Sequence, residues 1–342
     1  MREALANVRV GRRVTPAALP LAVLLFAIAW VAYKAFGSGF GVNGGVADWI
    51  RVTLAGLTLA GLYFVIASGF TLIFGLMRIV NMAHGSLYLL GAYAAFEFQT
   101  HHVVSWAWGV VISSLTVGVG GLVMHQIFLR WNQGQELRQA LITIAISVIV
   151  ADQVIAHFHE GLGRSTSWPG SIEKLVDTHI AGVHYSLARL TVLALGVAVG
   201  VGLWLWLYRT KTGMVIRAGV DDQRMTSALG INIQRTFAIA FVVGSALAAV
   251  GAVVWASQSN IATGQDAQWL LNSLVVVIVG GMGSIFGAAA GAILYAFVQN
   301  FSATYLPTTG VDCCTQYSPI FTFVLIALVL AFRPRGLFGR GG

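Results

Sequence analysis

Long apolar runs, separated by short polar connections, constrain this chain more than any other feature of its sequence. A helix that crosses a bilayer needs about 20 predominantly apolar residues. Hydrophobic residues form 57% of the 342 residues and charged residues 9%, which is too little charge to cover a soluble enzyme of this length. We therefore predict an all-α polytopic membrane protein with eight to ten membrane segments. The candidate runs are Ala17–Tyr33, Val52–Met77, Ile79–Phe96, Val103–Leu129, Ala140–His157, Leu187–Tyr208, Thr236–Ser257, Trp269–Gly280, Ile285–Phe301 and Pro319–Phe332.

Two of these runs predict irregular membrane helices. Trp269–Gly280 is too short to cross the membrane as a straight helix, so we expect half of a broken helix or a re-entrant segment there. Only Arg78 separates the second run from the third, which requires a tight junction. We expect the chain to pass twice through 269–301, because a single pass would move the basic C-terminal tail to the opposite side of the membrane.

The basic residues predict the orientation. The chain has 20 Lys and Arg against 12 Asp and Glu, a net charge of +8. With a cytoplasmic N-terminus, 15 of the 20 basic residues fall on the cytoplasmic side, as the positive-inside rule requires. We therefore expect both termini to be cytoplasmic, and the positive charge calls for no nucleic-acid partner. The first apolar run is either a signal peptide or an anchor helix, and we expect a retained anchor.

The longest predicted cytoplasmic segment, 209–235, contains the pattern of a short amphipathic helix. Asp221 or Asp222 can cap its N-terminus, and Gly230 can end it in the left-handed conformation. Such a helix either lies on the membrane surface or docks in a groove of a cytoplasmic partner. The apolar residues between cap and stop follow i, i+3, i+4 spacing, which places them on one face: Met225, Ala228 and Leu229.

Four stretches form an ordered set of motifs: Gly69–Gly85, Arg217–Asn232, Val279–Gly287 and Phe332–Gly339. The first leads a glycine-rich helix into an Asn-Met-Ala-His-Gly element, and the third contains Gly-Gly-x-Gly-Ser-x-x-Gly. Together they resemble the membrane permease subunits of branched-chain (hydrophobic) amino-acid ABC importers, of the high-affinity leucine type. The resemblance extends from about residue 50 to the end of the chain.

The resemblance implies an ATP-driven importer in the bacterial inner membrane, in which this chain forms half of the pathway for branched-chain or other hydrophobic amino acids. Its expected partners are a second homologous permease, two cytoplasmic ATPase subunits, a periplasmic substrate-binding protein and the lipid bilayer. The chain has no phosphate-binding loop motif, so we expect ATP and magnesium on the ATPases, no cofactor here and no enzymatic activity. The alternatives are a permease of the same family for urea or short amides, and a self-sufficient channel or secondary carrier.

On this interpretation the chain divides into four parts. The permease domain (50–332) contains an outer loop (158–186) and a cytoplasmic coupling loop (209–235). The segments outside it are a cytoplasmic basic N-terminus (1–16), an extra N-terminal membrane helix (17–36) and a cytoplasmic basic tail (333–342).

The segment 209–235 resembles the coupling loop of ABC importers, whose pattern is Glu-Ala-Ala-x-x-x-Gly. Here Thr226 and Ser227 stand near the small-residue pair, and no Glu precedes them. The residues predicted to couple the chain to the ATPase are Arg217, Asp221, Asp222, Arg224, Met225, Ser227, Ala228, Leu229 and Gly230.

Polar residues and glycines near the predicted breaks are the pathway candidates. His84 is an intramembrane ionisable residue or a neutral His bonded to a backbone carbonyl near the inner interface, and Ser86 stands where the family often has Glu. Asn81 can satisfy backbone groups at the break. Gly280, Ser284, Ala288 and Ala292 follow the four-residue spacing of tight helix packing. The pathway or helix-break candidates are Asn81, His84, Gly85, Gly280, Gly281, Gly283, Ser284 and Gly287.

The sequence offers little support for a metal site. Six of the eight histidines fall on the predicted outer side, including His101-His102, but without an arrangement of Cys or carboxylate ligands. We therefore predict no bound metal. Cys313 and Cys314 lie in a predicted outer loop, either as free thiols or as a strained vicinal disulfide.

Overall fold

A computed structural model describes most of the permease domain. The described residues are 45–77, 80–101, 104–158, 164–169, 172, 175–178, 183–305, 318–333 and 336–338. The predicted N-terminal segments 1–16 and 17–36, and the Cys313–Cys314 pair, lie outside the described residues.

Within these ranges the chain is almost entirely helical. The two short strands, β1 (Leu175–Thr178) and β2 (Val183–Ser186), pair antiparallel with Leu175 opposite Ser186. The helices are α2 (Gly45–Met77), α3 (His84–His101), α4 (Trp106–Met124) with a π turn (His125–Leu129) and a 3-10 turn (Arg130–Asn132), α5 (Glu136–Phe158), α6 (Leu187–Arg209), α7 (Lys211–Asp221), α8 (Gln223–Ala228), α9 (Ile233–Ala256), α10 (Gln265–Gly280), α11 (Ile285–Tyr305) and α12 (Ser318–Phe332).

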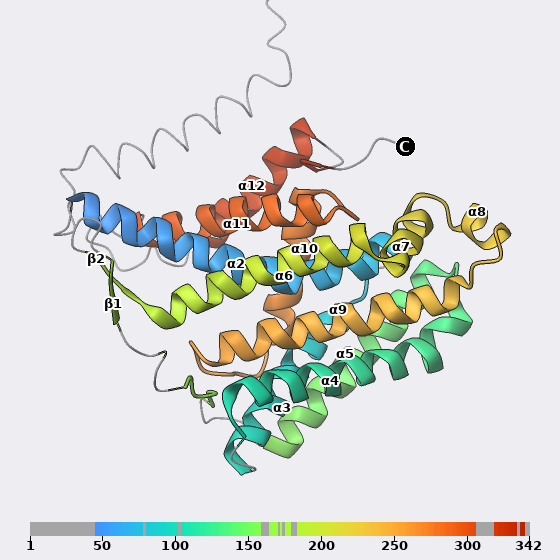
Figure 1. The fold of residues 1–342 in the computed structure, drawn as a ribbon, viewed down its shortest axis with the longest axis horizontal. Coiled ribbons are helices and arrows are strands. Elements are labelled where there is room, and N and C mark those ends of the chain that lie inside the picture. Colours follow the sequence, from blue (N-terminus) through green and yellow to red (C-terminus); the bar gives the residue numbers. More distant parts are fainter. Residues whose placement is uncertain are drawn as a thin grey trace, which may run out of the picture.

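Helix α2 is the centre of the bundle. It packs against α6, α9 and α11, while α4 and α5 lie farther out, against α9 and α3 respectively. Figure 1 shows α2, α6 and α9 running along the long axis of the molecule, with α7 and α8 at one end and the β1–β2 pair at the other. We refer to these as the helical end and the strand end.

Six helices in the described part of the chain are long and apolar enough to cross a membrane. Most of α2 is buried inside the protein, whereas α5 and α6 leave most of their apolar surface exposed, as expected of helices that face lipid or another membrane subunit. In a bilayer the backbone must satisfy its own hydrogen bonds, which explains why these apolar runs form helices. The predicted class, an all-α polytopic membrane protein, is confirmed.

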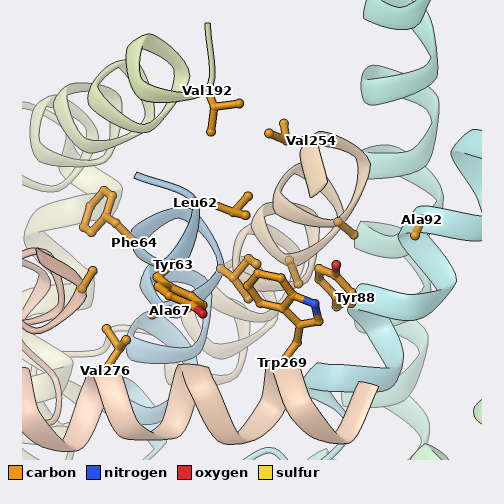
Figure 2. Close-up of a cluster of buried hydrophobic side chains, with 14 of the residues drawn as sticks. Leu62, Tyr63, Phe64, Ala67, Tyr88, Ala92, Val192, Val254, Trp269 and Val276 are labelled. Carbon is orange, nitrogen blue, oxygen red and sulfur yellow. The ribbon is translucent and has the colours of Figure 1, made fainter. Parts of the chain in front are cut away.

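The core is an aromatic cluster at the crossing of α10 with the long helices (Figure 2). Helix α10 runs crosswise to α2 and α9 in both views. Near its start, Trp269 stacks on Tyr88 of α3, with ring centroids 5.1 Å apart, and lies 5.4 Å from the ring of Tyr63 on α2 and 5.1 Å from that of Trp255 on α9. Such pairs add about 0.5–1.5 kcal/mol each beyond area burial, so the cluster fixes α10 between three other helices.

The structure corrects several details of the sequence-based expectations. The expected tight junction between the second and third runs is present, but the helix of the third run begins at His84 instead of Ile79. Helix α7 and the strand pair within the outer loop 158–186 were not predicted. The four-residue spacing of Gly280, Ser284, Ala288 and Ala292 spans the end of α10 and the start of α11, because the helix ends at Gly280 and restarts at Ile285.

Candidate functional site

A sharp reversal joins α10 to α11 at the glycine-rich third motif. Gly281 and Gly283 have φ values of +109° and +82°, a region that side chains with a Cβ rarely enter. The N–H of Gly281 still donates to the carbonyl of Val277 at 2.9 Å. Ser284 then caps α11, because its Oγ accepts a 3.0 Å hydrogen bond from the N–H of Gly287. The predicted helix break is therefore present and has a defined geometry.

The two helices of this hairpin touch through their backbones. A Cβ added to Gly280 would lie 2.1 Å from the carbonyl oxygen of Gly287, and one added to Gly287 would lie 2.4 Å from the carbonyl oxygen of Gly280. A turn farther on, a Cβ on Gly291 would lie 2.3 Å from the carbonyl oxygen of Val276. The small-residue prediction of close packing is thus confirmed between α10 and α11.

The first motif contacts this reversal directly. Gly75, near the end of α2, approaches Gly283 so closely that a Cβ on Gly75 would lie 2.9 Å from the Cα of Gly283. The sequence separates these two glycines by about 200 residues, and neither motif alone predicts the contact.

The beginning of α3 lies deep in the protein. His84 is fully buried, and its Nε2 lies 3.1 Å from the carbonyl oxygen of Ile66, eleven residues or about 16 Å before the end of α2. Asn81 Oδ1 accepts the N–H of Ala83 at 3.1 Å, and a Cβ on Gly85 would lie 2.1 Å from the carbonyl oxygen of Asp266. The predicted His-to-carbonyl bond is confirmed, and it is made inside the bundle, because the chain turns back before α3 starts.

At the helical end the segment 209–235 folds into two short helices. Thr210 caps α7 by accepting the N–H of Gly213 at 3.0 Å, and Asp222 caps α8 by accepting the N–H of Met225 at 3.0 Å. Gly230 has a φ of +81° and follows the last turn. The predicted cap and glycine stop of the short helix are therefore confirmed, with Asp222 as the cap and Asp221 as the last residue of α7.

The unpredicted helix α7 did leave a signal in the sequence. Its buried residues, Gly213, Ile216 and Gly219, follow a three-residue spacing after the Thr210 cap. Two glycines in 11 residues lower the helix propensity of this stretch, and packing against α2 and α6 overrides that preference.

Helix α8 is anchored on one side and exposed on the other. Thr226 is buried, with 3% of its surface exposed, and the side-chain amide of Gln223 donates to the carbonyl of Leu76 at the end of α2. Met225 and Leu229 are 62% and 74% exposed. Figure 1 shows α8 at the far tip of the helical end. The remaining predicted coupling residues on α8, Arg224, Ser227 and Ala228, are exposed as well.

The C-terminal motif completes the junction. The N–H groups of Leu337 and Phe338 donate to the carbonyls of Val279 and Gly280 at 2.9 Å each, and the Arg333 guanidinium donates to the carbonyl of Leu337 at 3.1 Å. The described part of the tail therefore lies at the same end as α7 and α8, as the expectation of two passes through 269–301 requires. All four motifs meet in this one region.

A large apolar groove leads away from this junction. It has a volume of about 1000 Å³ and runs between α2, α6 and α11, from Leu57 near the strand end to Asp221 at the helical end. At its helical-end mouth, the Arg217 guanidinium lies 4.4 Å from the centre of the Tyr208 ring, a cation–π contact. A groove of this length, lined mainly by apolar side chains, crosses most of the bundle.

A bundle of helices long and apolar enough to span a membrane, with an apolar groove along it and a glycine-rich junction at one end, is the architecture of a multi-pass membrane protein. The family model described as "Branched-chain amino acid transport system / permease component" matches residues 52–330, and the chain belongs to that family. The resemblance inferred from the four motifs is therefore confirmed, and so is the assignment to the inner membrane.

The chain matches curated relatives named BraD, LivH and LivM, all of them permease proteins of branched-chain amino acid transport systems. It is 28% identical to the high-affinity branched-chain amino acid transport system permease protein BraD of Pseudomonas aeruginosa, over 85% of this chain and 96% of the relative. It is 27% identical to LivH of Escherichia coli, over 83% of this chain and 94% of LivH. It is 22% identical to LivM of the same species, over 93% of this chain and 73% of LivM. No solved structure matches the chain.

Proposed function

We propose that this chain forms half of the translocation pathway of an ATP-driven importer for branched-chain or other hydrophobic amino acids. Its relatives BraD and LivH carry the names of high-affinity branched-chain amino acid permeases. The proposed assembly contains a second homologous permease, two cytoplasmic ATPase subunits that bind ATP and magnesium, and a periplasmic binding protein. The similarity to both LivH and LivM of one organism supports a paired permease.

The exposed apolar residues of α8 carry this proposal. A six-residue helix that leaves Met225, and Leu229 directly after it, exposed is typical of a segment that docks in a groove on a partner. The loop around α8 is basic, which by the positive-inside rule places the helical end in the cytoplasm. We assign Met225 and Leu229 as the docking face for the ATPase.

The contacts around α8 supply a route from the ATPase to the membrane helices. Gln223 ties α8 to the end of α2 through Leu76, and α2 meets the α10–α11 reversal at Gly75 and Gly283. A movement of α8 as a rigid body therefore displaces α2 and the reversal together. In this proposal the apolar groove between α2, α6 and α11 faces the second permease and lines the pathway.

The test compares two methionines with the same exposure on neighbouring helices. Met225→Ser and Leu229→Ser remove the proposed docking face, while Met214→Ser changes a residue of α7 that is also 62% exposed. The measurements are co-purification of the ATPase with the chain and uptake of radiolabelled leucine by cells that carry all subunits. We expect the α8 variants to lose both, and the α7 variant to keep both.

Other outcomes separate the alternatives. Full ATPase retention and uptake in both α8 variants would contradict docking and leave the membrane-surface interpretation of α8. Leucine flux through vesicles that contain the chain alone would favour a channel or secondary carrier. Uptake of urea or a short amide instead of leucine would identify the other permease type of the family.

A further inference from the structure

A second, smaller cavity opens at the strand end, away from the junction described above. Its volume is about 240 Å³, and its walls come from α2, the start of α6, the end of α9 and the end of α11. With about 30 Å³ for each water molecule, it has room for about eight waters, comparable with the nine non-hydrogen atoms of leucine. Trp255 forms part of its wall, and the ring centroids of Trp255 and Trp269 of the aromatic core are 5.1 Å apart.

One side of this cavity carries an unneutralised cation. Arg189 lines it, and no carboxylate lies within ion-pair distance of Arg189 among the described residues. Its guanidinium instead hydrogen-bonds with the Tyr185 phenol and lies 5.8 Å from the centre of that ring. Burial raises the pKa of Tyr185, so this phenol stays neutral and does not cancel the charge of Arg189. The indole N–H of Trp255, in the same wall, is buried without a hydrogen-bond acceptor in the described structure.

The other walls supply an acceptor and an apolar surface. Asn300 donates its side-chain N–H to the carbonyl of Val52 at 2.8 Å, which orients the amide and leaves its carbonyl oxygen as an acceptor. Leu59 and Leu62 of α2 line the cavity beside these polar groups. A cation, an amide oxygen and aliphatic side chains within one small cavity match the three parts of a free aliphatic amino acid.

We propose that this cavity binds a free aliphatic amino acid, with the carboxylate on Arg189, the ammonium group on the amide oxygen of Asn300 and the side chain against Leu59 and Leu62. The proposal rests on the proposed function, which places the strand end in the periplasm, where the binding protein releases its cargo. An inorganic anion would use Arg189 but leave the leucines and the amide oxygen without partners. The chemistry of the whole cavity therefore favours the zwitterion.

The test is equilibrium binding of radiolabelled leucine to the purified full-length chain. We expect saturable binding that weakens at least tenfold in Arg189→Gln and less in Arg189→Lys. Arg51→Gln is the matched control, because Arg51 lies in the first half of α2 in a 3.1 Å ion pair with Asp48 and does not line the cavity. The melting temperature of each variant shows whether it is folded, which we expect since Arg189 is exposed.

Competition with ligand fragments tests the assignment of each group. We expect leucinamide, which lacks the carboxylate, and 4-methylpentanoate, which lacks the ammonium group, to compete poorly. The proposal is overturned if the wild-type chain does not bind leucine, if Arg189→Gln binds it equally well, or if inorganic phosphate or 4-methylpentanoate competes as well as leucine, since these last results define a simple anion site.

Uptake measurements keep this proposal separate from the proposed function. Cells that import leucine through a chain that neither binds leucine nor depends on Arg189 would refute the cavity and retain the permease function. A chain that binds leucine through Arg189, in cells that fail to import leucine with all subunits present, would support the cavity and refute the import function.

Discussion

The packing of α10 against α11 makes Gly280→Ala the sharpest test of the junction. The added Cβ would lie 2.1 Å from the carbonyl oxygen and 2.4 Å from the carbonyl carbon of Gly287, and 2.9 Å from the backbone nitrogen of Ala288. All three atoms belong to the backbone of α11, so no side chain can rotate away. Since favourable contacts of carbon begin near 3.5 Å, the two helices must separate by roughly 1 Å or more.

The cost of this separation follows from the geometry. Overpacking a close contact costs about 1–3 kcal/mol, while replacing glycine by alanine inside a helix gains about 0.5–1 kcal/mol. Gly280 is the last residue of α10, so little of that gain applies. We expect a net loss of about 1–2 kcal/mol, which corresponds to a fall of about 2–5 °C in Tm. Movement of α10 also strains the bond from the N–H of Phe338 to the carbonyl of Gly280.

The assay is thermal unfolding of the purified chain in detergent, together with leucine uptake. Gly202→Ala in α6 is the matched control, because a Cβ at this helical glycine meets nothing within 4 Å. The control should melt at or slightly above the wild-type temperature, and Gly287→Ala should behave like Gly280→Ala. The reasoning is refuted if Gly280→Ala melts with Gly202→Ala and transports normally.

Substitutions at three further positions examine α8 and its anchor. Gly230→Val places a β-branched residue at a φ of +81°, and we expect leucine uptake to be lost while membrane insertion, measured by the amount of chain in the membrane fraction, stays normal. Asp222→Ala removes the cap of α8, at a cost of about 1 kcal/mol; proteolysis of the 209–235 segment should accelerate, and Asp222→Asn should restore protection because it keeps the acceptor. Gln223→Leu breaks the bond to Leu76, so we expect the ATPase to remain bound while uptake falls, and equal loss of both would contradict a transmitting role for this residue.

The sequence predicts the long helices well because their signal is local. The run Leu187–Tyr208 differs from α6 by a single residue at one end, since a continuous apolar run has one way to satisfy its backbone in a bilayer. The run Ile79–Phe96 places the start of its helix five residues before that of α3 (His84–His101), for a related reason. Hydropathy indicates whether residues are buried, not whether they are helical. The turn before α3 is itself largely buried, with Asn81 2% exposed, so hydropathy does not distinguish the turn from the helix that follows it.

The features of the candidate site also divide into those with a local signal in the sequence and those that depend on long-range contacts. Capping by Asp222 and the stop at Gly230 depend on neighbouring residues, and the sequence predicts both. The bond from Gln223 to Leu76 joins residues 147 positions apart, and no local pattern encodes it. The order of the four motifs indicates the family, but only the fold shows that they meet. The cavity beside Arg189 combines residues from four helices, so a reading of motifs could not find it.

The two proposed sites lie at opposite ends of one packed structure. The reversal at Gly283 touches the end of α2, to which Gln223 ties α8. Helix α10 leads from that reversal to Trp269, which contacts Trp255 in the wall of the small cavity. Because the α10–α11 hairpin packs backbone against backbone, it has no side-chain layer to absorb a displacement at one end. We therefore expect a shift of the reversal to move α10 as a rigid body and to reach the cavity through the aromatic cluster.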